Sequence, residues 1–487
     1  DFQAWAQKNS GSIKEMYSEQ ALFLTDAADG PCHHYPRAIM GEYLRVQMND
    51  ALHAAEESGV KLSLHSGLEV VDLVESGGQA RLVVNDGSGA RVRFGPFDGA
   101  LMATGHWAEP SSRENYFSSP WPAVDLLQKI PPGATVGVIG SSLSAIEVAL
   151  TLSSDGQFAR QDDGILVYRP SASPRTITLY SRRGQLPRVR GRIGARPNHY
   201  LTCKRLREEI EANPYAVKLS TLFDLLDREL AEAYGRSMDW QHVVNPAECV
   251  LKRLEDDLDR ARRGDGPDGE LVWQTVLVQI FPVVRELYLH LERSDRARFD
   301  REFNTLFFLH AATQPLINAE KLRALIKAGM VSVVRLGNEY RLSPHAESGA
   351  YEMIYEQKGG TSRRDVFTHC VDARGQRRSV ESDPSTLIQN LLKKGVVELI
   401  KPFGSSSRKS SVQAGARPGS ICIDPATHRV LRTKPLSSRC ADSAGGDFEL
   451  FAVGAMTRSQ IIDASMAYGI ARSTAAIANQ LIRKLRH

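Results

Sequence analysis

Two patterns of hydrophobic and polar positions alternate along this chain. Short apolar runs between polar turns are typical of strands, and apolar residues repeating every three to four positions are typical of amphipathic helices. The sequence predicts strands at 62–64, 80–84, 90–94, 99–104, 135–139, 175–180, 331–336, 340–342, 350–356, 366–371 and 449–453. It predicts helices at 1–7, 41–58, 203–211, 221–234, 247–262, 271–291, 319–328, 381–400 and 461–486. This order predicts an α/β protein with a helical insertion.

Length and composition narrow the class of protein. The 487 residues suffice for about three domains, and 61 Lys and Arg nearly balance 57 Asp and Glu, a net charge of +4. This balance argues against a protein that coats nucleic acid or an acidic membrane. The six cysteines form no CxxC pair, and no apolar run approaches ~18 residues. We therefore expect a cytoplasmic protein with no nucleic-acid or membrane partner. We also expect no bound metal, because His33, His34 and His310 have no partners at ligand spacing.

The sharpest motif follows the predicted strand 135–139. A glycine turn, Gly140-Ser-Ser-Leu-Ser-Ala145, leads into an amphipathic helix. This is the dinucleotide fingerprint, in which the glycine permits a tight turn and small residues let the backbone approach a pyrophosphate at the helix N-terminus. Ser142 departs from it, because a side chain at the second glycine position would crowd the phosphate. The candidate cofactor-binding residues are Gly140, Ser141, Ser142, Ser144 and Ala145. A plain strand-to-helix turn has the same local pattern.

The end of the next strand bears on the choice of cofactor. Strand 175–180 is followed by Ser181, Arg182 and Arg183. Arginines at this place suit the 2′-phosphate of NADP, whereas an acidic residue would suit the ribose of NAD. Asp162 and Asp163 lie about 20 residues after the glycine turn, where such an acid is expected, but no strand pattern precedes them. We read 154–174 as an inserted loop or hairpin, and favour NADPH.

Two further strands end in a glycine. Thr104 and Gly105 end strand 99–104, and Gly454 follows strand 449–453, before Met456 and Thr457 at the expected start of the last helix. A strand, a glycine turn and a helix N-terminus again suit an anion. The two strands lie on either side of the Gly140 unit along the chain. We therefore expect one domain interrupted by an inserted nucleotide-binding domain.

Together these strings resemble a known family. The matching strings, in chain order, are Phe2-Gln-Ala-Trp5, Pro36-Arg37 with Gly41-Glu-Tyr-Leu44, Ala103-Thr-Gly-His106, Gly140-Ser-Ser-Leu-Ser-Ala145, Ser181-Arg-Arg-Gly184 with Leu186-Pro187, and Phe451-Ala-Val-Gly454. The chain resembles the two-dinucleotide FAD/NAD(P)-binding flavoproteins, most closely the N-hydroxylating monooxygenases. Residues 454–466 and the insertion at 154–174 resemble the L-aspartate N-monooxygenases that form nitrosuccinate.

The resemblance implies a domain plan. A discontinuous Rossmann-like FAD domain would occupy 1–120 and 381–487, and a Rossmann-like NADPH domain 121–199 and 331–380. A helical insertion on the substrate side would occupy 200–330. The family begins with a strand and a GxGxxG that holds the FAD pyrophosphate, and no such motif precedes Phe2 here. We therefore expect the FAD domain to be incomplete at its N-terminus.

The resemblance also implies an activity. NADPH would reduce FAD, and the flavin would then use O₂, through a peroxyflavin, to hydroxylate the nitrogen of an amino acid or related amine. The residues implied to line the FAD site are Thr104, Gly105, Gly454, Met456 and Thr457. No motif supplies a catalytic base. Two alternatives stay open: a flavoprotein reductase or dehydrogenase on the same fold, and a non-catalytic nucleotide-binding remnant.

Arg37 has two interpretations. By resemblance it contacts FAD or the substrate. An ion pair with Glu42 or another nearby carboxylate explains it equally well.

Overall fold

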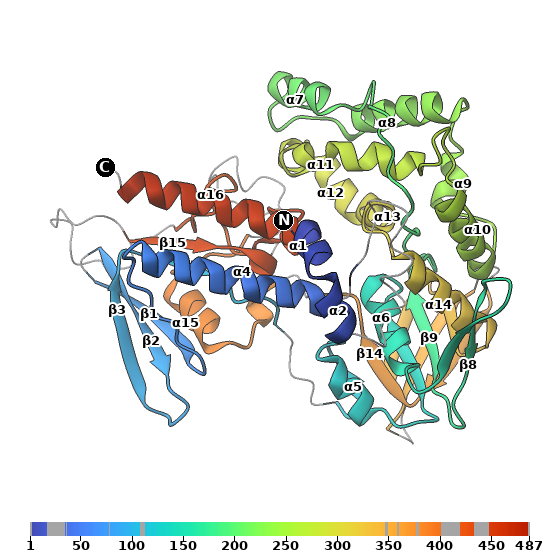
Figure 1. The fold of residues 1–487 in the computed structure, drawn as a ribbon, viewed down its shortest axis with the longest axis horizontal. Coiled ribbons are helices and arrows are strands. Elements are labelled where there is room, and N and C mark those ends of the chain that lie inside the picture. Colours follow the sequence, from blue (N-terminus) through green and yellow to red (C-terminus); the bar gives the residue numbers. More distant parts are fainter. Residues whose placement is uncertain are drawn as a thin grey trace.

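The computed structural model describes residues 2–16, 35, 37–76, 78–107, 113–345, 349–357, 360–375, 379–400, 419–432 and 448–485. Figure 1 shows three parts. We call them the parallel-sheet unit (113–183 and 316–375, lower right), the helical module (200–311, upper right) and the terminal unit (2–107 and 379–485, left). Cys32, Cys440, His33 and His34 lie outside the described residues.

The parallel-sheet unit contains five parallel strands in the order β10-β9-β6-β14-β5. Their bounds are Tyr116–Phe117 (β5), Thr135–Ile139 (β6), Thr176–Ser181 (β9), Val331–Arg335 (β10) and His369–Asp372 (β14). The helices of this unit are Ala123–Lys129 (α5), Leu143–Leu152 (α6) and Leu316–Lys327 (α14). Strand β6 and the apolar faces of α6 and α14 share one core, as expected for a parallel sheet covered by helices.

Two small antiparallel elements belong to the same unit. Strands β7 (Gln157–Arg160) and β8 (Leu166–Arg169) form a hairpin that contacts α14. Strands β11 (Tyr340–Pro344), β12 (Tyr351–Glu356) and β13 (Ser362–Phe367) form a sheet in chain order. Aromatic side chains of this sheet share a core with Ile139 and Tyr180 of the parallel sheet.

The helical module packs around α11, which contacts three of its other helices, α7, α8 and α13. The bounds are Cys203–Ala212 (α7), Leu219–Tyr234 (α8), Trp240–Val244 (α9), Val250–Arg263 (α10), Val272–His290 (α11), Arg293–Arg298 (α12) and Asn304–Ala311 (α13). A π-helix, Phe299–Phe303, joins α12 to α13. Figure 1 shows α7 and α8 as the outer layer above α11.

The terminal unit combines both ends of the chain. Its elements are α1 (Phe2–Lys8), α2 (Ser10–Met16), α4 (Arg37–Glu57), the antiparallel strands β1 (Glu69–Ser76), β2 (Gln79–Asn85) and β3 (Arg91–Phe97), β4 (Gly99–Met102), α15 (Thr386–Lys394), β15 (Glu449–Ala452) and α16 (Ala467–Leu485), with 3₁₀ turns at Val380–Ser382 and Gly454–Thr457. Strands β4 and β15 pair in parallel although about 350 residues separate them. One core joins β4, β15 and α15.

The predicted α/β class is confirmed, but several elements differ from prediction. The helix expected at 381–400 is an α-helix only over Thr386–Lys394 (α15). Residues 62–64 form no strand, whereas 69–76 form β1, which the pattern did not reveal. The single strand expected at 366–371 is two strands, because Thr368 turns the chain from β13 into β14 and bonds the backbone O of Thr135 through its Oγ1 at 2.9 Å. The last helix begins at Ala467 rather than near 461. No helix in the described residues has the length and apolar character needed to cross a membrane.

Candidate functional site

The glycine turn lies where the connections of the parallel sheet diverge. Strand β6 has β9 on one side, reached through α6, and β14 on the other, which comes from much later in the chain. Such a switch point leaves a crevice at the carboxyl ends of the strands, where α/β proteins bind ligands. Gly140 has φ +127°, and a Cβ there would lie 3.0 Å from the carbonyl O of Ala373. The backbone of this turn therefore requires glycine at position 140.

The four other residues of the motif have different surroundings. Ser141 is buried, donates its hydroxyl to the Gln185 carbonyl at 2.6 Å and lies 2.8 Å from Ser181 Oγ. It therefore joins the glycine turn to the loop after β9. Ser142 is exposed and is the N-cap of α6, with no capping bond from its side chain. Ser144, in the first turn of α6, is half-buried, and Ala145 lies in the core.

Three arginines gather at the neighbouring strand ends. Arg182 is exposed after β9, and Arg183 donates through Nη2 to the Glu302 carbonyl at 2.7 Å. Arg335 ends β10 and is paired with Ser181 in the sheet. Burial and the charges of Arg182 and Arg335 lower the pKa of Arg183. Arg335 was not among the predicted site residues, because only the pairing of β10 with β9 brings it to this strand end.

The competing acidic pair lies elsewhere. Asp162 and Asp163 are in the turn of the β7–β8 hairpin, where Asp163 Oδ1 accepts the backbone N–H of Ile165 at 2.9 Å. They follow no strand of the parallel sheet. The insertion at 154–174 is thus a hairpin. Arg182 and Arg183 lie at the strand end where the ribose of a dinucleotide, or its 2′-phosphate, would bind.

A second pair of strand ends lies in the terminal unit. The backbone N–H of Val453 bonds the Met102 carbonyl at 3.1 Å, so the glycines that follow β4 and β15 lie at the same edge. Gly105 has φ +75° and Gly454 has φ +81°, and no atom of the described residues lies within 4 Å of a Cβ built on either. Thr104, next to Gly105, is exposed. The structure thus brings Thr104, Gly105 and Gly454 together at an open edge.

Met456 and Thr457 have mainly structural contacts. Both are about 1% exposed, Met456 in the core, and Thr457 Oγ1 donates to the Gly454 carbonyl at 2.9 Å. The expected helix N-terminus at 456–460 is wrong, because α16 starts at Ala467. The Gln460 side chain bonds both the N–H and the carbonyl of Ile423, at 2.9 and 2.8 Å, which holds the chain out of a helix.

Arg37 forms an ion pair. Its Nη2 lies 2.8 Å from Oε1 of Glu147 on α6, and its guanidinium lies over the ring of Trp121. Glu42 pairs instead with Arg45. Burial raises the pKa of Glu147, and the charge of Arg37 opposes that rise. Arg37 therefore pairs with a nearby carboxylate, which is the second of its two interpretations, although the carboxylate is not Glu42. The ion pair connects α4 of the terminal unit to α6 of the parallel-sheet unit.

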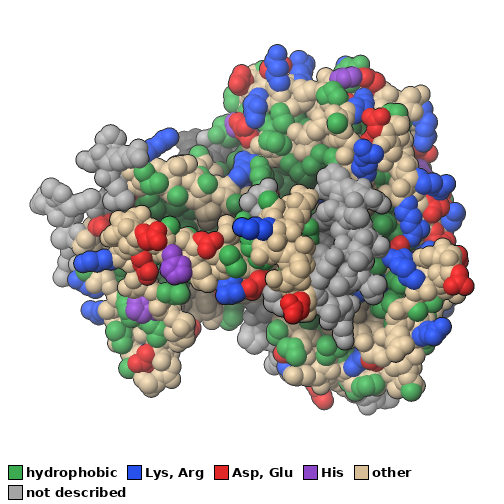
Figure 2. Space-filling model, viewed as in Figure 1, with side chains coloured by type: hydrophobic (Ala, Val, Ile, Leu, Met, Phe, Trp, Pro, Cys, Tyr) green, Lys and Arg blue, Asp and Glu red, His purple; other side chains and the backbone are tan. Residues whose placement is uncertain are grey.

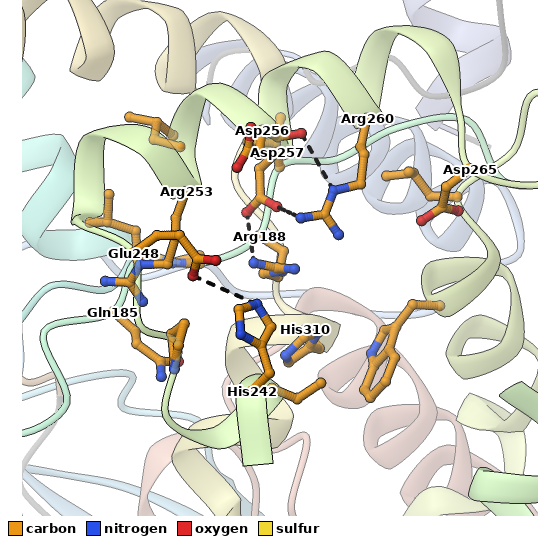
Figure 3. A pocket seen from close by; sticks show the side chains of 18 of the residues that line it. Gln185, Arg188, His242, Glu248, Arg253, Asp256, Asp257, Arg260, Asp265 and His310 are labelled. Atoms are coloured by element: carbon orange, nitrogen blue, oxygen red, sulfur yellow. Dashed lines mark hydrogen bonds and ion pairs between the residues drawn. The ribbon is translucent and has the colours of Figure 1, made fainter. Parts of the chain in front are cut away.

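A cavity of about 230 Å³ lies between the chain segment 185–189 and the helical module. Figure 3 shows Arg188 inside it, with Nη1 3.1 Å from Oδ2 of Asp257 on α10. Burial lowers the pKa of Arg188 and raises that of Asp257, while each charge opposes the shift of its partner. Arg192, four residues further along the chain, also contacts the helical module, because its Nη1 donates to the Asp268 carbonyl at 3.0 Å.

Comparison with known proteins found similarity to a family model, to one curated protein and to solved structures. Residues 1–107 match a family model described as FAD-NAD(P)-binding. The uncharacterized protein YdhS of Escherichia coli (strain K12) is 26% identical over 401 residues, covering 77% of this chain and 70% of YdhS.

Two solved structures show low similarity. The reduced form of ornithine hydroxylase (PvdA) from Pseudomonas aeruginosa is 12% identical, with a TM-score of 0.46, over 97% of this chain and 81% of that chain. The Kutzneria sp. 744 ornithine N-hydroxylase KtzI, with FADred, NADP+ and L-orn, is 12% identical, with a TM-score of 0.40, over 97% and 82%. Both TM-scores are below 0.5, so we draw no functional conclusion from them. The family match itself confirms the predicted FAD-NAD(P)-binding class for the N-terminal part of the chain.

Proposed function

We propose that this chain is an NADPH- and FAD-dependent monooxygenase that hydroxylates the nitrogen of an amino acid or a related amine. The observation that carries the proposal is that one chain has glycine turns at the carboxyl ends of parallel strands in two separate sheets: Gly140 in the parallel-sheet unit, and Gly105 with Gly454 in the terminal unit. The family match over residues 1–107 and the resemblance of the ordered motifs support the same activity.

The residues around Gly140 fit the pyrophosphate and 2′-phosphate of NADPH. The turn has no side chain at its closest approach to Ala373, and the first N–H groups of α6 are available to an anion. Three guanidiniums gather at the ends of β9 and β10, and their mutual repulsion is relieved by a phosphate. Arg182 and Arg335 would hold the 2′-phosphate. Ser141 would hold the glycine turn next to the loop that follows β9.

The edge formed by Thr104, Gly105 and Gly454 fits an FAD group that approaches the backbone closely. No atom of the described residues crowds either glycine, and both have the positive φ that glycine adopts readily. When bound there, reduced FAD supplies the activation of O₂ and the transfer of one oxygen atom. The chain's own part is to orient the two cofactors on separate strand edges and to exclude water between them.

One assay with three readouts tests the activity. The purified protein is supplied with FAD, and NADPH oxidation, hydroxylamine product and H₂O₂ are quantified with a panel of amino acids and amines. We expect product formation that depends on both cofactors. NADPH oxidation that yields only H₂O₂ with every amine would refute the monooxygenase and favour the reductase or dehydrogenase alternative. Absence of FAD binding when the full-length gene is expressed would refute both enzymatic interpretations.

A pair of variants tests the NADPH assignment. In Arg182→Ala and Arg335→Ala the KM for NADPH should rise ~10- to 100-fold, the effect of losing one charge-assisted hydrogen bond, while the KM for NADH changes less than about twofold. Arg169→Ala, an exposed arginine on the β7–β8 hairpin, is the matched control and should leave both constants unchanged. Equal effects on NADPH and NADH would show that these arginines do not read the 2′-phosphate.

A further inference from the structure

A separate pocket of about 200 Å³ lies between the ends of β9 and β10 and the N-terminus of α10. We call it the strand-end pocket. The charged side chains that line it among the described residues are three arginines, Arg183, Arg253 and Arg335, and one carboxylate, Glu248. Its volume is several times the ~30 Å³ that one water molecule occupies in the liquid, so a group of several heavy atoms fits inside.

Contacts at Gly184 bring the three arginines to one place. Arg183 precedes this glycine in the chain, and Arg253 Nη2 donates to the Gly184 carbonyl at 2.9 Å. A Cβ at position 184 would lie 2.8 Å from the Cβ of Arg335, so the loop after β9 touches the end of β10. The loop after β9, the end of β10 and α10 therefore meet at this glycine, and each of them supplies one arginine.

The arginines of the strand-end pocket have no acidic partners. Arg183 and Arg253 each donate to a backbone carbonyl, that of Glu302 and that of Gly184, and neither forms an ion pair with a described residue. The side chain of Arg335 forms neither a hydrogen bond nor an ion pair within the described ranges. Arg253 Nε is also buried and unbonded. The pocket thus keeps unused donors and positive charge.

Other basic residues of α10 do have acidic partners. Arg263 lies 3.2 Å from Asp259, and Lys252 lies 2.7 Å from Asp256. Figure 2 shows basic and acidic side chains interspersed along the right edge of the molecule, where Figure 1 places α10. Such alternation is typical of a solvated helix face. Arg253 differs from these residues, because it bonds the loop after β9 instead of an acid of its own helix.

The first turn of α10 adds to the positive potential. Cys249 is the N-cap of this helix of 14 residues, and its side chain makes no capping hydrogen bond. Cys249 and Val250 line the strand-end pocket together with the arginines. The N-terminus of a helix carries about half a positive charge and presents backbone N–H groups to an anion.

The charges of the pocket match a dianion. Three guanidiniums against one carboxylate leave a net charge of +2 (3 − 1). A phosphate monoester carries about −1.5 to −2 at pH 7, whereas a carboxylate would neutralise only half of the charge. Glu248 itself lies 3.6 Å from Nε2 of His242, as Figure 3 shows. Burial is the main reason that the pKa values of Arg183 and Arg253 are lowered, and a bound dianion would oppose that effect.

From these observations we propose that the strand-end pocket binds the 2′-phosphate of NADPH, and that Arg253 and the N-terminus of α10 complete this site from the helical module. The inference deepens the NADPH assignment made above, on which it rests. That assignment named arginines of the parallel-sheet unit alone. With Arg253, two units of the fold together distinguish NADPH from NADH.

The test is calorimetric titration of the full chain with NADP⁺ and with NAD⁺, without an amine. We expect NADP⁺ to bind at least ~10-fold more tightly, and 2′-AMP to displace it at concentrations at which inorganic phosphate does not. Displacement by inorganic phosphate as effective as that by 2′-AMP would show a site for free phosphate and overturn the proposal. Absence of NADP⁺ binding would overturn both this inference and the NADPH assignment.

A matched pair of variants locates the site. Arg253→Met keeps an apolar stem and removes the guanidinium, so it should weaken NADP⁺ binding ~10-fold and NAD⁺ binding less than about twofold. A distorted strand end would weaken both dinucleotides alike, so the ratio of their affinities separates the two effects. Arg263→Met is the control: its side chain is 77% exposed at the other end of α10, and both affinities should stay within about twofold. If Arg253→Met keeps the native ratio, this inference is overturned and the NADPH assignment is not.

A third variant predicts a gain. Glu248→Gln removes the negative charge that lines the pocket, so it should tighten NADP⁺ binding ~2- to 5-fold. This gain measures the charge of the pocket even where Arg253→Met does not fold. Unchanged or weaker NADP⁺ binding by Glu248→Gln would overturn the proposal. Because turnover is not measured, these results are separate from the test of amine hydroxylation.

Discussion

A buried ion pair fastens the helical module to the terminal unit, and breaking it should destabilise the protein strongly. Arg285 of α11 lies 2.8 Å from Oδ1 of Asp463 and donates through Nη2 to the Gly469 carbonyl at 3.0 Å. The two side chains are 8% and 16% exposed. Removing one member of such a pair leaves the other charge buried without its partner, which costs about 3–5 kcal/mol.

The magnitude for Asp463→Ala should lie near the lower end, about 3 kcal/mol, because Arg285 keeps the Gly469 carbonyl. Replacing both members, in Arg285→Met with Asp463→Leu, removes both charges and fills similar volume. That double variant should differ from the native protein by only ~1 kcal/mol.

Equilibrium unfolding in urea, followed by circular dichroism, measures these differences in the free energy of unfolding. Asp50→Ala, on the exposed face of α4, is a control expected within ~0.5 kcal/mol of the native protein. If Asp463→Ala costs less than ~1 kcal/mol, or if the double variant is as unstable as the sum of the two singles, the pair is not buried in the way the structure indicates.

Three further predictions concern single residues. Gly140→Ala should lower the free energy of unfolding by ~1–3 kcal/mol and abolish NADPH binding, because its φ is +127° and the new Cβ would lie 3.0 Å from the Ala373 carbonyl O. A thermal melt measures the first effect and an NADPH titration the second. A variant that binds NADPH normally would refute the role of this turn. Burial lowers the pKa of His428 to about 4, below its usual ~6.5, so the unfolded chain binds the extra proton between these values. The contribution of neutral His428 to stability is complete above pH ~6.5 and is lost as the pH falls toward 4, about 3 kcal/mol in all. Urea unfolding of the native protein and of His428→Phe across this pH range measures it. The free energy of unfolding should depend less steeply on pH in the variant. Arg37→Ala should cost less than ~1 kcal/mol in the same assay, because its side chain is 69% exposed, and a larger loss would mean that the contact with Glu147 is not a simple surface ion pair.

The parallel-sheet unit was the most predictable part of the fold. Strand 135–139 agrees with β6 at both ends, because an uninterrupted apolar run followed by glycine is typical of a buried parallel strand. The hairpin at 157–169 could be placed but not paired from sequence alone. Strand β1 escaped prediction because Asp72 and Glu75 interrupt its apolar pattern, and both carboxylates are paired with basic side chains, Lys394 and Arg432, from the far end of the chain.

The candidate site was predictable only where local sequence determines it. The turn at Gly140 and the glycines at 105 and 454 could be found from the strand patterns. Arg335 could not be joined to Arg182 and Arg183 without knowing that β10 lies beside β9. The start of α16 was misplaced because Gln460 and Asp463 bond Ile423 and Arg285, which are distant in sequence. Long-range partners of polar side chains were the missing information.

The order of strands in the parallel sheet has a consequence for synthesis on the ribosome. Strand β14 pairs with β6 and β5, yet it is made about 230 residues after β6. At ~5–20 residues per second, the inner edge of β6 waits roughly 10–50 s for its neighbour. During that interval the nascent chain presents a bare, apolar strand edge, which is the feature that chaperones recognise and that aggregation exploits. The helical module, whose helices are local and complete by residue 311, can fold meanwhile.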